Sequence, residues 1–196
     1  MHDPEDTNSI SQNIIHKIIK DKNGDIWIGT WGGGITRISQ QGLKIYNSQN
    51  GLEAKQIFSV IEDVEGNILI GSSHKGLAIF KGDQFENYGI KEGLKNTEVY
   101  AIIQDKNKDY WIGTNNGITV LDRDLKNVVA YHVKENVFEE KLGIQIGNKI
   151  RFLRLDKNKN IWIGTEDQRV LFYDSQTGIF KNDLVINNWF ARSDYL

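Results

Sequence analysis

The sequence predicts an all-β fold, a β-propeller built from about four four-stranded antiparallel blades. One ten-residue segment is present four times, starting at Asp21, Asp63, Asp105 and Asp156, so successive copies lie 42, 42 and 51 residues apart. In every copy a turn rich in Asp and Asn separates two apolar runs, which is the pattern of a β-hairpin. Repeats of about 40–45 residues made of short strands are typical of propeller blades.

The first copy, residues 21–30, shows how one repeat is expected to fold. Asp21 can accept hydrogen bonds from the backbone amides ahead of it, and the Asn-Gly pair that follows tolerates a positive φ. The run Ile-Trp-Ile at 26–28 is apolar on consecutive residues, which predicts a strand covered on both faces by stacked blades. Gly29 then allows either a close approach of another strand or a bend before the next strand.

We expect the elements to follow one another in a simple order. A lead-in covers residues 1–12, and 13–196 holds the propeller repeats. The four blades are predicted over the approximate ranges 13–46, 57–88, 98–132 and 149–181. Residues 184–191 have the character of one more first strand, so we expect the chain to end inside a repeat. Equivalent buried positions, where blades stack, are predicted for Trp27, Trp111 and Trp162.

Ring closure has two alternatives. Four repeats and an extra strand leave sheet edges that a closed ring would hide. Either 184–191 pairs with the first blade in a tight four-bladed ring, or the chain is an open arc cut from a larger propeller. We favour the open arc, because the tail keeps the character of a first strand. Exposed edges would promote self-association.

Composition excludes several classes of partner. The chain has 24 basic and 26 acidic residues, a net charge of −2 and no basic block, so neither nucleic acid nor an anionic membrane surface is an expected partner. Cysteine is absent, which excludes a disulfide framework, a thiolate metal site and a cysteine nucleophile. No apolar run approaches the ~20 residues of a membrane span. Residues 1–6 lack the pattern of a secretory signal, so in an exported parent this chain would be an internal piece.

The repeated segment resembles the two-component regulator propeller repeat. The resemblance rests on Asp-x-x-Gly-x-Ile-Trp-Ile-Gly-Thr and on the Asn-Gly-Leu at 50–52 and Glu-Gly-Leu at 92–94 before first strands, and it covers about residues 13–190. That family forms the periplasmic sensor region of bacterial hybrid histidine kinases and related regulators, often those controlling polysaccharide use. The resemblance implies an extracytoplasmic module that senses a ligand or a partner within a larger signalling protein. A dimeric parent protein is the other expected source of self-association. The module itself is not expected to be an enzyme, because it contains no catalytic constellation.

Several positions depart from the pattern of the family. Leu69 replaces the Trp of the second copy, Lys108 and Lys159 replace the turn glycine, and Arg169 stands where glycine stands in the first two copies. The fourth blade is therefore the weakest match. A propeller enzyme, lyase-like or hydrolase-like, and a scaffold built on the same repeat remain the alternatives.

The sequence predicts no catalytic residue, no metal site and no cofactor. Asp21, Asn23 and Asp25 have the 1-3-5 spacing of a calcium loop, but the loop lacks the glycine at position six and the glutamate at position twelve. An Asp-box of the sialidase kind fits poorly, because the Asp precedes the Gly by three residues and no cluster of arginines is present. His16 is expected to be a packed or edge residue of a strand. No two carboxylates can be placed at the separation that glycoside cleavage requires.

The candidate ligand-binding surface is the face where the loops between second and third strands emerge. Connections between blades, including residues 133–148, join the same face, whereas the closely similar Asp-x-Asn-Gly turns lie on the other. Loops that vary while the framework repeats are where function is added. Trp31, in a glycine-rich loop, offers an aromatic platform for an oligosaccharide or another small polar ring compound, or else covers the edge of the next blade. The predicted binding residues are Trp31, His74, Lys75, Asn115, Asn116, Glu166, Asp167 and Arg169.

Overall fold

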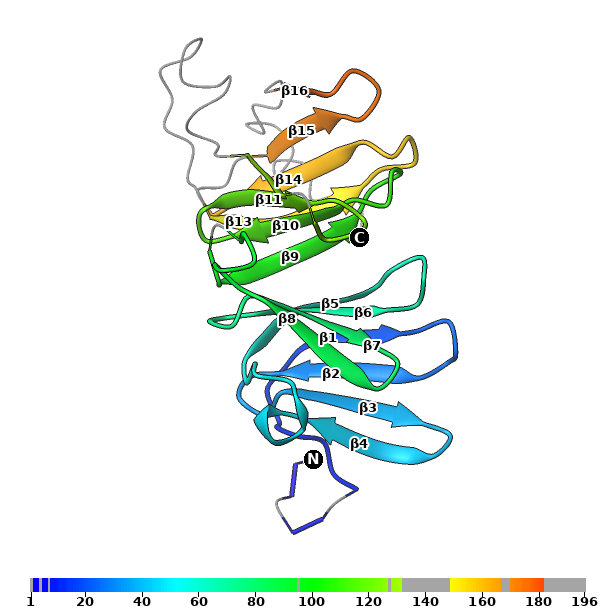
Figure 1. Ribbon diagram of the computed structural model, residues 1–196. Coiled ribbons are helices and arrows are strands. Elements are labelled where there is room, and N and C mark those ends of the chain that lie inside the picture. The colour runs from blue at the N-terminus through cyan, green and yellow to red at the C-terminus, as the bar shows by residue number, and fades with distance from the viewer. Residues whose placement is uncertain are drawn as a thin grey trace, which may run out of the picture.

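The structure is a computed structural model of the chain (Figure 1). It describes residues 2–3, 5–6, 8–94, 96–126, 128–131, 149–166 and 170–181. The predicted connection at 133–148 and the predicted strand at 184–191 lie outside the described residues.

The described residues form four antiparallel four-stranded sheets in simple meander order, which confirms the all-β propeller prediction. Blade 1 consists of β1 (Ile15–Lys20), β2 (Ile26–Thr30), β3 (Ile35–Ser39) and β4 (Gly42–Tyr46). Blade 2 consists of β5 (Ile57–Glu62), β6 (Ile68–Ser72), β7 (Leu77–Lys81) and β8 (Gln84–Tyr88). Blade 3 consists of β9 (Val99–Gln104), β10 (Tyr110–Thr114), β11 (Gly117–Leu121) and β12 (Val128–Tyr131). Blade 4 consists of β13 (Ile150–Leu155), β14 (Ile161–Thr165), β15 (Val170–Asp174) and β16 (Ile179–Lys181). A short 3-10 helix, η1 (Ser48–Asn50), lies between blades 1 and 2.

The hydrophobic core lies between the blades rather than within one of them. One cluster joins blades 1 and 2 around Trp27, a second joins blades 2 and 3 around Leu69, and a third joins blades 3 and 4 around Trp111. Every residue of β6 and β10 is buried, as expected for a strand packed on both faces.

In blades 1 to 3, the glycine of the second strand is a point of close approach to the next blade. A Cβ added at Gly29 would lie 2.6 Å from Ile57 Cγ2, and one added at Gly113 would lie 2.7 Å from Ile150 Cγ2. The branched side chain at the start of each following first strand therefore occupies space that only glycine leaves open. Of the two roles predicted for Gly29, the structure shows the close approach.

The four blades form an open arc. First strands of successive blades pack against each other in the series β1–β5, β5–β9 and β9–β13. Within the described residues, blades 1 and 4 lie at opposite ends of the stack and no packing between β13 and β1 closes it (Figure 1).

The tryptophan prediction is confirmed for two of three residues. Trp27 is 1% exposed and Trp111 is 2% exposed, and both lie against the following blade. Trp162 is only half-buried. Its burial was predicted wrongly because, in the described part of the chain, blade 4 has no following blade to cover it.

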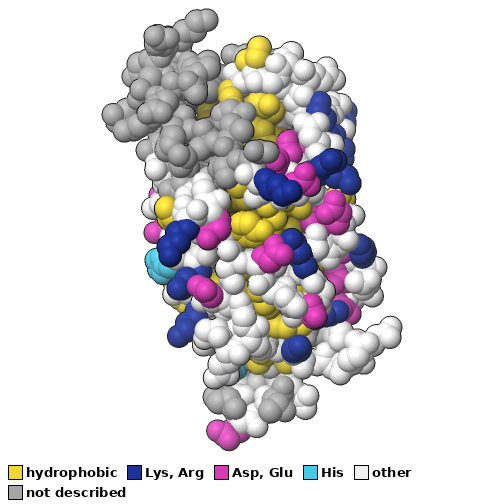
Figure 2. Space-filling view, viewed as in Figure 1, with side chains coloured by type: hydrophobic (Ala, Val, Ile, Leu, Met, Phe, Trp, Pro, Cys, Tyr) yellow, Lys and Arg dark blue, Asp and Glu magenta, His cyan; other side chains and the backbone are white. Residues whose placement is uncertain are grey.

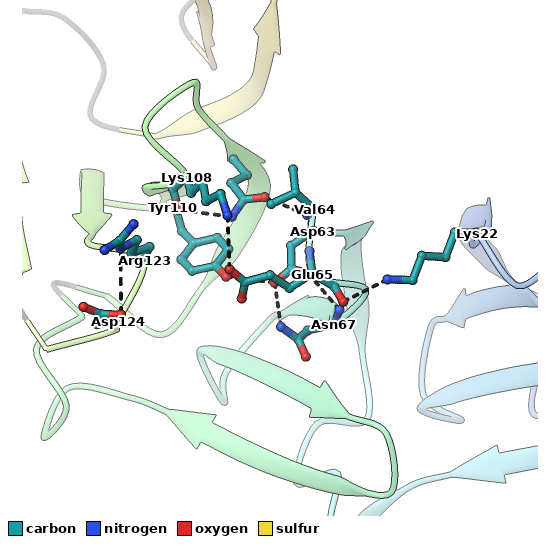
Figure 3. Close-up of polar contacts among 10 residues, drawn as sticks. Lys22, Asp63, Val64, Glu65, Asn67, Lys108, Tyr110, Arg123 and Asp124 are labelled. Atoms are coloured by element: carbon teal, nitrogen blue, oxygen red, sulfur yellow. Dashed lines mark hydrogen bonds and ion pairs between the residues drawn. The ribbon is translucent and has the colours of Figure 1, made fainter.

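The turns on one face of the arc are linked from blade to blade (Figure 3). The ammonium of Lys22 in blade 1 donates a 2.8 Å hydrogen bond to the carbonyl of Glu65 in blade 2. The hydroxyl of Tyr110 in blade 3 donates one of 2.8 Å to Oδ2 of Asp63, and Lys108 lies 3.6 Å from the carboxylate of Glu65. These contacts bind the turn of blade 2 to both of its neighbours.

The lead-in is more ordered than a loose polar segment. The amide of Ser11 donates a 3.0 Å hydrogen bond to the hydroxyl of Thr36, and Ser11 is buried. Ser9 exchanges hydrogen bonds with the backbone of Asp3. Residues 8–13 therefore lie on blade 1.

Charged side chains of both signs are interspersed over the visible surface, as the balanced composition predicts (Figure 2). None of the helices found in the described residues has the length and apolarity needed to span a membrane.

Candidate functional site

A β-bulge occurs at the same place in the first strand of every blade. The pairing of first and second strands skips one residue, and the skipped residues are His16, Phe58, Tyr100 and Arg151. A bulge turns the side chain of the extra residue away from the regular alternation. Because the first strands pack against one another, four bulged residues from four blades lie along one line.

Three of the bulged residues and Trp31 form a continuous row, which we name the aromatic row (Trp31, His16, Phe58 and Tyr100). The ring centroids of His16 and Trp31 are 5.1 Å apart, and that of Phe58 is 5.6 Å from each of them. Phe58 and Tyr100 are stacked at 4.8 Å with an interplanar angle of 20°. These separations lie in the range of favourable aromatic pairs. Trp31 and His16 are exposed, whereas Phe58 and Tyr100 are half-buried.

Charged groups surround the blade 3 end of the row. Lys149 Nζ lies 4.8 Å and Arg151 Cζ lies 5.1 Å from the centroid of the Tyr100 ring, within cation–π range. Both cations pair with Glu166, at 3.2 Å for Lys149. The hydroxyl of Tyr100 donates a 2.7 Å hydrogen bond to Glu98. Two cations and two carboxylates thus balance one another.

The pKa values of these groups follow from their contacts. Burial and the hydrogen bond to Glu98 raise the pKa of Tyr100, so its hydroxyl stays protonated and remains a donor. Burial opposes the charge on Lys149, but its contacts with Tyr100 and Glu166 raise its pKa. Desolvation alone would raise the pKa of the Glu166 carboxyl. The contacts of this carboxyl with Lys149 and Arg151 outweigh desolvation, so the pKa is lowered. Lys149 and Glu166 therefore both carry their charges at neutral pH.

The loop that carries Trp31 is held in place. The amides of Gly32 and Gly34 both donate to the carbonyl of Lys55, at 3.0 and 2.9 Å, and Trp31 bridges to Gln56 of the next blade. Backbone hydrogen bonds to the segment that enters blade 2 therefore hold the glycine-rich stem in place. The indole of Trp31 nevertheless stays 39% exposed.

His74 and Lys75 lie beside the Trp31 loop. They and Gly32 border a shallow cavity of about 320 Å³ between blades 1 and 2. Lys75 pairs with Glu53 at 3.5 Å, and both side chains are exposed. The structure thus brings the predicted residues of blades 1 and 2 to one surface.

The remaining predicted residues lie further along the arc. The amide of Asn115 donates to the carbonyl of Glu98, and that of Glu166 donates to the carbonyl of Lys149, so each loop is attached to the start of its own first strand. The amide of Asn116 donates to the hydroxyl of Thr114. Of the eight predicted residues, Glu166 meets the aromatic row through Lys149 and Arg151, and Trp31 belongs to it. Asp167 and Arg169 lie outside the described residues.

The sequence reasoning missed most of the aromatic row. His16 was expected to be a packed or edge residue, and Phe58 and Tyr100 were not singled out. A signal was present: His16, Phe58 and Tyr100 are spaced by 42 residues, like the repeat itself. The bulge, which brings them into one line, leaves no mark in the sequence.

A second, larger cavity lies at the turns, on the other face. Its volume is about 680 Å³, and its lining includes Glu62, Gln104, Lys106 and Lys159 from three blades. Gln104 accepts a 2.9 Å hydrogen bond from the amide of Val64, and Glu62 accepts one of 2.8 Å from that of Lys22, so these side chains connect blades. Within the described ranges no group of three or more His, Cys, Asp or Glu side chains is arranged to hold a metal ion.

Four stacked blades with an aromatic row along their first strands define a β-propeller module. The family model described as "two component regulator propeller" matches residues 9–32, 93–116 and 145–167. Segments of blades 1, 3 and 4 therefore match the two-component regulator propeller repeat, whereas no segment of blade 2 is matched. Among curated proteins, no match was found.

Solved structures with the same fold include extracellular domains and a lyase. The extracellular domain assigned to the hybrid two-component system BT3049 of B. thetaiotaomicron has a TM-score of 0.74 and 24% identity, and the match covers 90% of this chain and 24% of that one. The extracellular domain assigned to the hybrid system BT4673 of B. thetaiotaomicron has a TM-score of 0.69 and 20% identity, and the match covers 90% of this chain and 25% of that one. Virginiamycin B lyase of Staphylococcus aureus has a TM-score of 0.68 and 16% identity, and the match covers 88% of this chain and 56% of that one. The chain thus spans about a quarter of the two extracellular domains, and likeness at this identity concerns the fold.

Proposed function

We propose that this chain is part of the sensing region of a two-component regulatory protein, outside the cytoplasm, and that it recognises a sugar or another polar ring compound along the aromatic row. Two findings support the proposal. The repeats are those of the two-component regulator propeller, and similar folds occur in extracellular domains assigned to hybrid two-component systems.

The observation that carries the proposal is the combination of the aromatic row with the charged cluster beside it. Ligands with polar rings need an apolar surface and a few directed hydrogen bonds. Trp31 and His16 supply exposed ring surface, and Arg151 and Glu166 supply exposed donors and acceptors. Because the two cations are balanced by Glu98 and Glu166, the site favours a neutral ligand over a strongly acidic one.

The likeness to virginiamycin B lyase supports an enzyme as the alternative function. At 16% identity it concerns the fold. The row contains one histidine, His16. Its ring contacts are with Trp31 and Phe58, which suits a place in a binding surface.

The test is an oligosaccharide array probed with the full chain, followed by calorimetric titration of the bound glycans. Trp31→Ala and Arg151→Ala are expected to weaken binding at least about tenfold, the effect of about 1.4 kcal/mol. Val64→Ser, an exposed residue of the turns on the other face, is the matched control and should leave affinity unchanged.

Unchanged affinity in both Trp31→Ala and Arg151→Ala would move the site away from the aromatic row. Mass spectrometry of the bound glycans after incubation separates sensing from catalysis. A product that accumulates over many turnovers would favour the enzyme alternative.

A further inference from the structure

The residue before the turn aspartate connects a blade to the blade that precedes it. In blade 2 this residue is Glu62, whose Oε2 accepts a 2.8 Å hydrogen bond from the backbone amide of Lys22 in blade 1. In blade 3 it is Gln104, whose Oε1 accepts one of 2.9 Å from the amide of Val64 in blade 2. The amide that directly follows the turn aspartate is thus bound, in both interfaces, by a side-chain oxygen of the next blade.

Blade 4 interrupts this series. Its residue at the same position is Leu155, whose side chain has no atom that could accept a hydrogen bond. The equivalent amide in blade 3 belongs to Lys106, an exposed residue. Within the described residues this amide has no acceptor. Because backbone donors are normally paired, the amide of Lys106 is available to water or to a ligand.

The residues of this interrupted contact border the cavity of about 680 Å³ on the turn face. Lys106 and Leu155 line it together with Ile102 and Ile103 of β9. Ile102 is buried, and Ile103 and Leu155 are half-buried. The cavity therefore has an apolar wall next to an amide that lacks its acceptor.

Cations gather where blades 3 and 4 meet at this cavity. The ammonium of Lys106 donates a 2.6 Å hydrogen bond to the carbonyl of Ser175, so its side chain lies against blade 4. Lys159, from the turn of blade 4, also lines the cavity and has no acidic partner within the described ranges. An anion bound to the amide of Lys106 would thus lie close to positive charge.

The carboxylates that line the cavity are Glu62, Asp63 and Asp105. Both oxygens of Asp63 and of Asp105 accept hydrogen bonds from the chain itself. Glu62 is bound to the amide of Lys22 in blade 1, and its buried Oε1 has no partner in the described part of the chain. Unsatisfied negative charge is therefore found toward blade 1, at a different interface from the cations.

We propose that this cavity binds a small monocarboxylate with an apolar body. The carboxylate of the ligand accepts from the amide of Lys106 and lies near the ammonium groups of Lys106 and Lys159, while its apolar body packs on Leu155 and Ile103. Charge-assisted hydrogen bonds of this kind are stronger than neutral ones.

The interface between blades 1 and 2 supports the choice of a carboxylate. There Glu62 binds the amide of Lys22 directly beside the turn aspartate, Asp21, so a carboxylate is accepted at this position of the repeat. The ligand would supply from outside the group that Leu155 does not supply. This site lies on the turn face, and it does not depend on the function proposed for the aromatic row.

The test is a titration of the ¹⁵N-labelled full chain with hexanoate, followed by the amide signals in NMR spectra. The signal of Lys106 is expected to shift saturably at millimolar hexanoate. Hexanamide, the neutral isostere, should bind several-fold more weakly, because it cannot pair with the ammonium groups. High salt should weaken the binding of hexanoate for the same reason.

Two variants move the missing acceptor. Leu155→Gln provides the oxygen that Gln104 provides one blade earlier, so it should shift the amide signal of Lys106 without ligand and weaken hexanoate binding at least about tenfold. Gln104→Leu removes that oxygen from the amide of Val64 and should make this second amide respond to hexanoate. Arg154→Gln introduces the same side chain at the neighbouring exposed position and is the matched control, with binding unchanged.

Three results would overturn the proposal: no saturable shift of the Lys106 amide up to about 10 mM hexanoate, hexanamide binding as tightly as hexanoate, or full binding in Leu155→Gln. Thermal melting establishes that each variant folds. If Leu155→Gln does not, Lys159→Gln replaces it and should lower both the affinity and its salt dependence. Binding of glycans along the aromatic row, measured with Leu155→Gln or its replacement, should be unchanged, so the two proposals can fail separately.

Discussion

The indole Nε1 of Trp27 donates a 2.8 Å hydrogen bond to Oδ2 of Asp21, six residues earlier in the same hairpin. The other oxygen of Asp21 accepts from the amides of Asn23 and Asp25, both at 2.9 Å. One carboxylate thus organises the turn and orients the aromatic ring that fills the space between blades. Both oxygens of this carboxylate therefore accept hydrogen bonds from the chain.

The same connection is present in blades 3 and 4 and is replaced in blade 2. Trp111 donates to Asp105 at 3.1 Å and Trp162 to Asp156 at 3.4 Å. Blade 2 has Leu69 instead of Trp, and there the hydroxyl of Tyr110 from blade 3 donates to Asp63. The repeat therefore keeps a donor for this carboxylate even where the tryptophan is lost.

Trp111→Ala is expected to lower the free energy of unfolding by about 3–5 kcal/mol, the range for large aromatic side chains in cores. The indole is 2% exposed and packs against blade 4. Trp162→Ala is the matched variant, and because Trp162 is half-buried its loss should stay below about 3 kcal/mol. Urea unfolding of both variants measures the difference. Equal losses would mean that Trp162 is as buried as Trp111 in solution.

Tyr110→Phe tests the replacement of the missing tryptophan. The substitution removes the hydroxyl that donates to Asp63 and leaves the ring in place. Because a buried carboxylate then loses a donor, the free energy of unfolding is expected to fall by about 1–3 kcal/mol. In Tyr88→Phe the lost hydrogen bond is the exposed one to Glu86, and the expected loss is smaller. Thermal melts of the two variants provide the comparison. If Tyr88→Phe costs as much as Tyr110→Phe, the contact with Asp63 has no special role.

Stability should fall as the solution is made acidic. Burial opposes ionisation of Asp21 and Asp63. Hydrogen bonds nevertheless lower the pKa of both carboxyls below 3.8. Asp21 accepts from Trp27, and Asp63 accepts from Asn67 and Tyr110. A carboxyl whose pKa is lower in the folded chain stabilises the fold above its unfolded pKa of about 3.9, and this contribution disappears as the pH falls through the folded pKa.

Urea unfolding of the wild type at pH 7 and pH 3 should therefore show a loss of stability at the lower pH. Asp63→Asn removes one of the responsible carboxyls and should flatten this dependence, whereas Asp83→Asn at an exposed turn should not. A variant with Asp63→Asn that keeps the full pH dependence would contradict the assignment.

Local chemistry made the architecture predictable from the sequence. The Asp-x-Asn-Gly turns, the apolar runs beside them and the glycine at Gly29 each determine structure within a few residues, and their 42-residue spacing defines the blades. The half-buried state of Trp162 could not be predicted in that way, because it depends on what lies beyond its own blade.

The candidate site was predictable only in part, for the same reason. Trp31 was found because an aromatic residue in a glycine-rich loop is conspicuous. Phe58 and Tyr100 resemble ordinary strand residues, and only the bulge and the packing of successive first strands bring them together. Such contacts between distant repeats are a property of the assembled arc and not of any one segment.

Gly113→Ala is expected to destabilise the chain through the interface between blades 3 and 4. The added methyl group would lie 2.7 Å from Cγ2 of Ile150 and 3.0 Å from its Cβ, so one of the two strands must shift. Overpacking of this kind costs about 1–3 kcal/mol. Gly89→Ala is the control, because its methyl group would meet only Glu92 Oε2, at 3.5 Å, and it should be neutral or slightly stabilising. Denaturant midpoints of the two variants decide the matter, and equal midpoints would contradict the close approach.

Lys108→Gly is expected to stabilise the chain, although it removes a side chain from the surface. Lys108 has a φ of 71° and Lys159 one of 66°, where the equivalent residues of blades 1 and 2 are Gly24 at 89° and Gly66 at 92°. The left-handed conformation costs a residue with a Cβ about 1–2 kcal/mol. The ion pair of Lys108 with Glu65, at 3.6 Å between half-exposed side chains, contributes little against that cost. After the entropy that glycine gains in the unfolded chain is deducted, a net increase of about 0.5–1 kcal/mol in the free energy of unfolding remains.

Lys106→Gly, in the same turn but without a positive φ, should instead lower stability, partly because its ammonium donates a 2.6 Å hydrogen bond to the carbonyl of Ser175. Urea unfolding of the two variants checks the prediction, and a Lys108→Gly variant as destabilised as Lys106→Gly would show that the turn of blade 3 carries no strain.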